Sequence, residues 1–242
     1  MLLFAEIEIN SKRCYSVKKA SEELMSSYEF ILFDLDGTLT DSSEGITRSV
    51  AHALESMGIS VPDLDALCKF IGPPLQESFK QFYGLSESES LTAIKLYREH
   101  HFNEGGLFEN VVYDGIRELL ERLKTQGKTL IVATSKPRPY AESILEHFGL
   151  SQYFDFISGS ELDGSRVDKA EVIDHALKRC GISDISKAIM VGDRRFDVSG
   201  ARSNGLNCIG VLYGFGSREE LEAAGADYIV ETVSELEDLL CE

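Results

Sequence analysis

The sequence predicts an α/β protein with a doubly wound parallel sheet, into which a helical domain is inserted. From Glu29 onward, short apolar segments alternate with amphipathic helical patterns, which is typical of strand–helix–strand units joined by right-handed crossovers. The apolar segments contain few polar positions, as expected of strands that helices cover on both faces. Between residues 44 and 110 this alternation stops, and only helical patterns remain.

Six strands are expected in the alternating part of the chain. Each is a short apolar run bounded by glycine or polar residues. In chain order they are Phe30–Leu35, Thr129–Thr134, Phe154–Ser158, Ala188–Gly192, Cys208–Leu212 and Tyr228–Val230.

Apolar residues at spacings of three and four mark two of the intervening helices. In the first helix Asp114 is the expected N-cap, and Gly149 is expected to end the second. Their apolar stripes are Ile116, Leu119, Leu120 and Leu123, and then Ile144, Leu145 and Phe148. We interpret both stripes as core packing.

The helical interruption divides the chain into parts. Residues 29–43 and 111–242 are expected to form the core, residues 44–110 a helical cap, and residues 1–28 an N-terminal extension without recognisable chemistry. An insertion of this length after the first strand would lie at the carboxyl edge of the sheet, where α/β proteins bind ligands. We therefore expect the cap to cover a ligand site.

The charge and the cysteines of the chain exclude several classes of function. The 242 residues include 24 basic and 41 acidic ones, a formal net charge of −17 that disfavours a nucleic acid polymer or an anionic membrane as partner. No apolar segment is long enough to span a membrane, and the N-terminus lacks signal-peptide features. The five cysteines are scattered without a Cys-x-x-Cys pair, which favours a reduced cytoplasm over a zinc site or disulfides.

Two acidic residues directly follow the apolar part of the first expected strand. Strand alternation places the carboxylates of Asp34 and Asp36 on the same side of the chain. Carboxylate oxygens bind hard cations such as Mg²⁺, and the turn at Gly37 exposes backbone N–H groups to an oxyanion. Taken alone, an acid before a glycine is often only a turn or a helix cap.

Three further segments supply complementary groups. Thr134 and Ser135 end the second strand, where a hydroxyl and backbone amides can hold phosphate oxygens. Lys169 begins a helical pattern and can neutralise a carboxylate. Asp193 and Asp197 follow the fourth strand, and Asp193 adds an oxygen ligand for Mg²⁺. Since parallel strands present their carboxyl ends at one edge, we expect the strand-borne groups to meet there.

In this order, the four segments resemble the motifs of the haloacid dehalogenase superfamily, in the type of phosphatase that has a helical cap between the first two motifs. Thr134 matches the second motif. The third motif is a lysine, for which Lys169 is the better match and Lys136 the competitor. The residues that match the first and fourth motifs, Asp-x-Asp-Gly-Thr/Val and Gly-Asp-x-x-x-Asp, are Asp34, Asp36, Gly37, Thr38, Gly192, Asp193 and Asp197.

The resemblance implies a Mg²⁺-dependent phosphatase with a Rossmann-like core. Asp34 would attack phosphorus to form an aspartyl-phosphate, and Asp36 would protonate the leaving oxygen and then activate water. Mg²⁺ would be bound by the side chains of Asp34 and Asp193 and by the backbone carbonyl of Asp36. Asp197 would orient Lys169 or a metal-bound water. The expected phosphate ligands are Thr134, the amide of Ser135, Lys169 and Gly37.

Two segments, Phe70–Leu75 and Leu212–Gly216, resemble the phosphoglycolate phosphatase branch of this family. A small phosphorylated metabolite is then the expected substrate, and a 5′-nucleotidase or an inorganic pyrophosphatase of the same branch is the alternative. A sugar phosphomutase is less favoured. The intact motifs disfavour a dehalogenase or an inactive binding protein. Arg48, Lys69 and Gly72 are weak candidates for substrate contacts from the cap, and monomer and homodimer both stay open.

Overall fold

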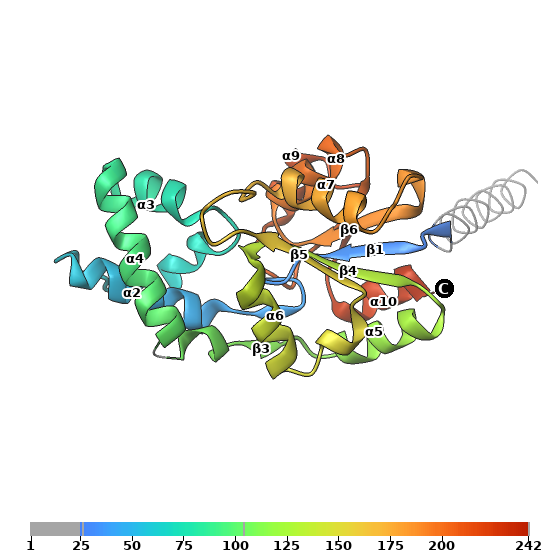
Figure 1. Ribbon diagram of the computed structural model, residues 1–242, viewed down its shortest axis with the longest axis horizontal. Coiled ribbons are helices and arrows are strands. Elements are labelled where there is room, and N and C mark those ends of the chain that lie inside the picture. Colours follow the sequence, from blue (N-terminus) through green and yellow to red (C-terminus); the bar gives the residue numbers. More distant parts are fainter. Residues whose placement is uncertain (1–24, 26, 104, 242) are drawn as a thin grey trace, which may run out of the picture.

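The computed structural model describes residue 25, residues 27–103 and residues 105–241. They form an elongated molecule in which helices lie at one end of an α/β core (Figure 1). The core sheet has six parallel strands in the order β5-β4-β1-β6-β7-β8, which confirms the predicted fold class. The strands are β1 (Phe30–Phe33), β4 (Thr129–Pro137), β5 (Phe156–Ser160), β6 (Ala188–Gly192), β7 (Asn207–Val211) and β8 (Tyr228–Val230).

The winding of the sheet reverses at β1. The chain runs from β1 to β4 and β5 on one side, and then returns to β6, β7 and β8 on the other. The carboxyl ends of β1, β4 and β6 therefore lie side by side, at the switch point where doubly wound sheets bind their ligands.

Two layers of helices cover the sheet (Figure 1). Their apolar residues form two clusters, one on each face of the sheet. On one face lie α5 (Ile116–Thr125), α6 (Arg138–His147) and α10 (Val233–Cys241), and on the other α7 (Lys169–Arg179), α8 (Arg195–Ser203) and α9 (Arg218–Ala224).

The apolar stripe predicted for α5 is fully buried in the first of these clusters. The start of this helix differs from the prediction, since its N-cap is Gly115 rather than Asp114. Gly115 has a φ of 86°, a left-handed conformation that glycine adopts without steric cost.

The strands differ from their predicted bounds mainly where the polar segments begin. β1 ends at Phe33: the Asp34 N–H still donates to the carbonyl of Val191 in β6, but the Leu35 N–H donates to Oδ1 of Asp34 at 2.7 Å and leaves the sheet. β4 continues past Thr134 to Pro137. β6 and β8 have the predicted bounds, while β5 starts and ends later and β7 earlier than predicted.

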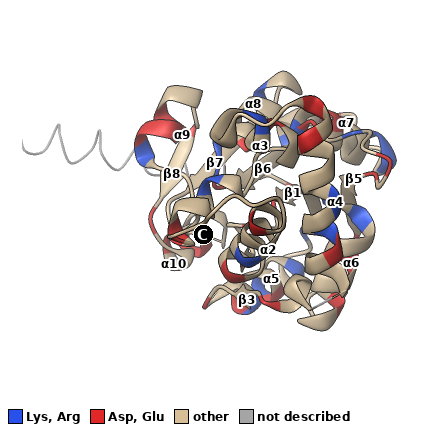
Figure 2. Ribbon diagram, turned by 90° about the vertical axis from the view of Figure 1, so that its left-hand side faces the viewer, with Lys and Arg blue, Asp and Glu red and all other residues tan. Residues whose placement is uncertain are grey.

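Charged residues lie almost entirely outside the sheet. Figure 2 shows Lys, Arg, Asp and Glu on the helices and loops around it. Among the six core strands, Lys136 in β4 is the only charged residue. This lysine lies at the carboxyl edge of the sheet, beside the predicted site.

The helical end of the molecule, here called the cap, has a hydrophobic core of its own. Leu54, Leu67, Phe70, Phe79 and Tyr97 belong to this third cluster, and all are buried. Within residues 44–103 and 105–110 the cap contains no strand. Its elements are α2 (Ser43–Ser56), η1 (Asp65–Phe70), α3 (Leu75–Tyr83), α4 (Glu87–Asn103) and η2 (Gly106–Phe108).

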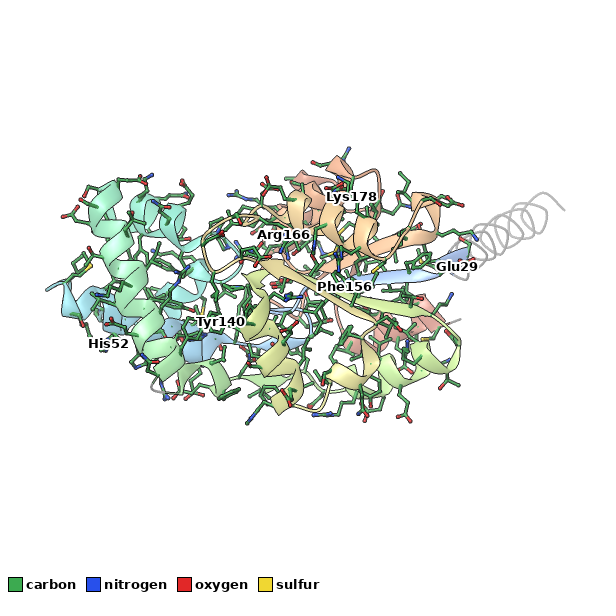
Figure 3. The ribbon with its side chains drawn as sticks, in the orientation of Figure 1. Glu29, His52, Tyr140, Phe156, Arg166 and Lys178 are labelled. Atoms are coloured by element: carbon green, nitrogen blue, oxygen red, sulfur yellow. The ribbon has the colours of Figure 1, made fainter. Side chains whose placement is uncertain are left out.

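Several contacts join the cap to the core. The two connecting segments pair as a short antiparallel ribbon of β2 (Thr40–Asp41) and β3 (Val111–Val112). Tyr140, at the end of α6 nearest the cap (Figure 3), stacks on Phe102 of α4 with ring centroids 3.5 Å apart. The guanidinium of Arg194 in the core donates to the carbonyl of Ile71 in the cap.

The predicted N-terminal extension of residues 1–28 lies mostly outside the described residues. At its end, Met25 and Tyr28 are only 2% exposed and pack into the core cluster on the α5 face. The Tyr28 hydroxyl also accepts a hydrogen bond from the side-chain amide of Asn207, at 2.7 Å. The core therefore includes residues that the sequence interpretation assigned to the extension.

In the part of the chain that the structure describes, no helix combines the length and the apolar character needed to cross a lipid bilayer.

Truncation tests this boundary. We expect a chain that starts at Met25 to keep its activity and melting temperature. A chain that starts at Glu29 should be less stable, because removing one large core side chain typically costs about 2–5 kcal/mol. Thermal unfolding of both truncated chains and the full chain measures the difference. Equal melting temperatures for the two truncated chains would contradict the packing role of Met25 and Tyr28.

Candidate active site

Groups from three neighbouring strands meet at the carboxyl edge of the sheet. Asp34 directly follows β1, and its N–H donates to the carbonyl of Val191 in β6 at 2.9 Å. Asp193 directly follows β6, and Thr134 lies near the end of β4. Asp34 and Thr134 line one cavity, and Asp34 and Asp193 belong to one group of carboxylates.

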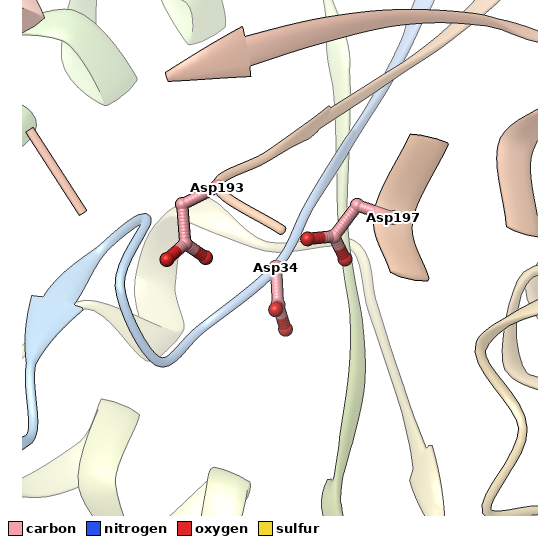
Figure 4. A group of neighbouring side chains, drawn as sticks. All are labelled: Asp34, Asp193 and Asp197. Carbon is pink, nitrogen blue, oxygen red and sulfur yellow. The ribbon is translucent and has the colours of Figure 1, made fainter. Parts of the chain in front are cut away.

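Asp34, Asp193 and Asp197 form a buried acidic cluster. One oxygen of each carboxylate lies within 4.8 Å of the others. Figure 4 shows the three side chains close together, each on a different segment of the chain. Oδ2 of Asp193 accepts a hydrogen bond from the N–H of Phe215 at 2.7 Å, while its Oδ1 is buried without a hydrogen-bond partner among the described residues.

Lys169 is the cation of this cluster. Its Nζ lies 2.8 Å from Oδ1 of Asp34 and 2.8 Å from Oδ1 of Asp197, and it donates to the carbonyl of Ala133 at 3.1 Å. Burial alone would lower the pKa of Lys169, but the charges of Asp197 and Asp34 outweigh it and raise the pKa. Lys169 is therefore charged and bridges the nucleophile candidate and Asp197.

Lys169 does not fully compensate the other two acids of the cluster, Asp193 and Asp197. Burial raises the pKa of Asp193, and the charges of Asp197 and Asp34 raise it further. Burial also raises the pKa of Asp197, although Lys169 opposes this effect in part. A divalent cation near these oxygens would favour their charged forms.

The donor set fits Mg²⁺, which prefers oxygen ligands. Asp193 offers a buried oxygen that has no hydrogen-bond partner in the described part of the chain, and Asp34 lies beside it. In contrast, Asp197 uses one oxygen for Lys169 and the other for the N–H of Arg194, at 3.0 Å. This arrangement suits the part expected for Asp197, which is to orient Lys169. Ligation by the Asp36 carbonyl stays a prediction.

The side chain of Asp36 has a different partner from that of Asp34. Its Oδ2 lies 3.2 Å from Nζ of Lys136, and both side chains are largely buried. The structure thus places the two candidate lysines apart, with Lys169 at Asp34 and Lys136 at Asp36. No sequence motif suggested this second pair, which forms because β4 is the neighbour of β1.

Gly37 serves the site in another way than expected. Its N–H donates to the carbonyl of Thr40 at 2.8 Å. This amide is therefore not available for phosphate, in contrast to the prediction. Gly37 has a φ of +85°, and a Cβ at this position would lie 2.3 Å from Oδ2 of Asp193. Glycine is therefore required because the turn brings the backbone against the acidic cluster.

A bulge in β4 presents the candidate phosphate ligands. Between Ala133 and Pro137 the register with β5 shifts, so the residues between them leave the regular ladder. The Oγ1 of Thr134 accepts a hydrogen bond from the N–H of Lys136 at 3.2 Å, which leaves its hydroxyl hydrogen free to donate. Thr134 and Ser135 both line the cavity that contains Asp34.

This cavity has a volume of about 430 Å³ and lies between the core and the cap. The sequence interpretation expected the cap to cover the site and named Gly72, which lines this cavity. It did not identify the other residues of the cap wall, although Ala93, Tyr97 and His101 at four-residue spacing indicate one face of a helix. The lining residues from the cap include Phe70, Leu75, Ile94, Tyr97, Arg98, His101 and Phe102.

The weak cap candidates lie mostly elsewhere. Arg48 forms exposed ion pairs with Glu44 and Glu109 and does not line this cavity. Lys69 lies over the ring of Phe82 and lines a neighbouring cavity instead. Gly72 lines both cavities. Substrate contacts from Arg48 and Lys69 are therefore not supported by their positions.

Comparison with known proteins agrees with this arrangement. The sequence profile of the family described as "Haloacid dehalogenase-like hydrolase" matches residues 31–211. A protein of Pseudomonas aeruginosa named 5′-nucleotidase is 54% identical over 196 residues, which are 81% of this chain and 88% of that protein. The tyrosine-protein kinase PtkA of Mycobacterium tuberculosis is 40% identical over 216 residues, 88% of this chain and 73% of its own length.

A solved structure shows the same fold. The crystal structure of a predicted phosphatase from Clostridium acetobutylicum has a TM-score of 0.84 and 53% sequence identity, over 87% of this chain and 97% of that one. The profile match spans most of the chain and includes the residues of all four motifs, while the segment Leu212–Gly216 lies just beyond it. The chain therefore belongs to the haloacid dehalogenase-like hydrolase family.

Proposed function

We propose that this hydrolase of phosphate esters is a Mg²⁺-dependent phosphomonoesterase that works through an aspartyl-phosphate. The observation that supports it best is the buried cluster in which Lys169 bridges Asp34 and Asp197 beside Asp193. Asp34 of this cluster lines the same cavity as Thr134. Nucleophile, cation and phosphate ligand are thus held together before substrate binds.

Asp34 is the proposed nucleophile. Lys169 and the N–H of Leu35 hold its Oδ1, which leaves Oδ2 to attack phosphorus. The attack forms the bond from Asp34 to phosphorus and breaks the bond from phosphorus to the ester oxygen. Thr134 and the Ser135 amide bind the oxygens of the transferring phosphoryl group.

Asp36 is the proposed proton donor and acceptor. It lines the cavity together with Asp34 and is held by Lys136 at 3.2 Å. In the first step it gives a proton to the leaving alcohol. In the second step it takes a proton from the water that hydrolyses the phosphoenzyme, which releases inorganic phosphate and restores Asp34.

Mg²⁺, held by Asp34, Asp193 and the carbonyl of Asp36, would supply positive charge that offsets the negative charge of the phosphoryl group. Local positive charge matters in this chain, because its net charge of −17 repels an anionic substrate.

The cavity favours one of the substrate classes that the sequence left open. Cavities of about 300–1,000 Å³ hold ligands of drug size, and this one measures about 430 Å³. A two-carbon leaving group such as glycolate would leave most of it empty. The aromatic cap wall of Phe70, Tyr97 and Phe102 can pack against a planar group. Together with the 54% identical relative named 5′-nucleotidase, this supports a nucleoside 5′-monophosphate as the substrate.

Replacing the nucleophile is the first test. We expect Asp34→Asn to lower phosphate release at least about 1,000-fold, because the amide cannot form the phosphoenzyme. Asp174→Asn, on the exposed side of α7, is the control and should keep the activity of the natural chain. Substantial phosphatase activity in Asp34→Asn would refute the assignment.

Metal dependence is the second test. A chelator should abolish phosphate release, and added Mg²⁺ should restore it. Mg²⁺ should also raise the melting temperature of the enzyme, since a ligand that binds only the folded state stabilises it. Asp193→Asn should remove most of that rise. Hydrolysis that persists in the chelator would contradict a metal-dependent reaction.

A substrate panel is the third test. We expect kcat/KM for adenosine 5′-monophosphate to exceed that for 2-phosphoglycolate and for pyrophosphate at least tenfold, because the nucleoside is the larger leaving group and can contact the aromatic cap wall. The assay measures inorganic phosphate, with a parallel assay for ATP-dependent phosphorylation of a tyrosine peptide. A preference for 2-phosphoglycolate, or transfer to the peptide without hydrolysis, would contradict the nucleotidase proposal.

A further inference from the structure

Exposed apolar side chains gather at the cavity that contains Asp34. Among the described residues, seven large apolar side chains are substantially exposed, and three of the seven line this cavity. These are Leu91 at 54% exposure, Leu162 at 46% and Val167 at 40%. A single exposed apolar residue is ordinary on a protein surface, but several around one ligand cavity mark a binding surface.

The three side chains come from both walls of the cavity. Leu91 lies near the start of α4 in the cap. Leu162 and Val167 lie in the core, on the loop of residues 161–168 between β5 and α7. In Figure 1 this loop leaves the end of β5 and extends toward the cap. Lys169, which directly follows the loop, is anchored to the nucleophile candidate, so the loop has a fixed place beside the reacting groups.

Hydrogen bonds within the loop define its first half. The N–H of Glu161 donates to the carbonyl of Ser165 at 3.0 Å, and the N–H of Gly164 donates to the carbonyl of Glu161 at 3.2 Å. The carboxylate of Asp163 accepts hydrogen bonds from the N–H and the hydroxyl of Ser165, at 2.9 and 2.7 Å. Leu162 therefore lies on a closed turn, in a defined position.

Arg166 defines the second half of the loop. Its φ is 52°, and it is the only residue other than glycine with a positive φ in the described part of the chain. Such a conformation is unfavourable for a residue with a Cβ and persists where surrounding contacts impose it. Nε of Arg166 donates to the carbonyl of Gly159 at 3.0 Å, and its guanidinium pairs with Glu161. These contacts hold the backbone directly before Val167, which lines the cavity.

What the loop offers to a ligand is mainly apolar. Its acids Glu161 and Asp163 also line the cavity, but they bond Arg166 and Ser165 of the loop itself. The proposed reaction holds the phosphoryl group at the edge of the sheet, which leaves the rest of the cavity for the leaving group. A part of the leaving group with apolar faces would release water from the exposed side chains on both walls, and this release favours binding.

We propose that Leu162 and Val167, together with Leu91 of the cap, form an apolar subsite that binds the base of a nucleoside 5′-monophosphate. This inference rests on the proposed function and deepens it, because it makes the base, rather than the ribose, the selective part of the leaving group. A purine base is planar with apolar faces, so it can pack between side chains of the two walls. A sugar phosphate without a base would leave these side chains in water.

The experiment compares adenosine 5′-monophosphate with ribose 5-phosphate, which carries a hydroxyl group in place of the base. The ratio of their kcat/KM values, here called the base preference, is measured for each variant through the release of inorganic phosphate. A general change in activity cancels in this ratio. We expect a base preference of at least about tenfold in the natural chain, since even one methylene in a fitting apolar pocket changes kcat/KM about 10- to 200-fold.

Substitutions in the loop test the subsite directly. The double variant Leu162→Asn/Val167→Thr keeps the approximate size of both side chains but makes them polar, so the base preference should fall at least about fivefold. Leu162→Met keeps an apolar side chain of similar volume and should keep most of the preference. Since both positions are exposed, we expect the variants to fold, and thermal unfolding checks this before their ratios are compared.

The matched controls carry the same changes at exposed apolar positions outside the cavity. Leu64 is 42% exposed on the cap and Ile185 is 40% exposed on the core, and neither lines the cavity. The double variant Leu64→Asn/Ile185→Thr should therefore have the base preference of the natural chain.

The outcomes separate this inference from the proposed function. If the natural chain releases phosphate from neither compound, the proposed function fails and the inference fails with it. If the natural chain hydrolyses adenosine 5′-monophosphate no better than ribose 5-phosphate, the proposed function stands but the subsite does not. If the loop variant is slower on both compounds with an unchanged ratio, the loop supports Lys169 or contacts the cap directly, and binding of the base is refuted.

Discussion

The ion pairs of Lys169 with Asp34 and Asp197 are the interaction on which the rest of the site depends. Removing three carboxylates from water is costly unless charges and hydrogen bonds compensate them. Among the described residues, Lys169 is the only cationic side chain that forms an ion pair with this cluster, and it also donates a hydrogen bond to the carbonyl of Ala133 in β4. One side chain from the start of α7 thus ties together the ends of β1 and β4 and the start of α8.

This constraint separates the chemistry from the choice of substrate. The acidic cluster lies at the carboxyl edge of the sheet, on the segments that follow β1 and β6 and on the first turn of α8. The far wall of the cavity is α4, a helix of the cap, which reaches the core through the Phe102–Tyr140 stack. Residues of the cap can therefore change the recognised leaving group without disturbing the groups that bind phosphate.

Several details of the site depend on contacts that sequence patterns do not encode. β1 stops at Phe33 because the Leu35 N–H donates to the Asp34 carboxylate rather than to a neighbouring strand, although the apolar side chain of Leu35 is typical of a strand. Gly37 looks like a phosphate-binding turn, yet its amide bonds Thr40 and its missing Cβ makes room for Asp193. The sequence left Lys169 and Lys136 as alternatives for one motif position. In the structure Lys169 pairs with Asp34, and Lys136, which lies on the neighbouring strand β4, pairs with Asp36.

The sequence by itself determined the parallel sheet, the helical insertion and the identity of the acidic and lysine candidates, because these follow from local periodicity and from short motifs at strand ends. Only the tertiary structure decided the packing of Met25 and Tyr28 into the core, the Lys136–Asp36 pair and the cavity wall formed by Tyr97 and His101. The physical reason is that these features join segments far apart in the chain. Their partners are selected by strand order and helix packing, neither of which leaves a local pattern.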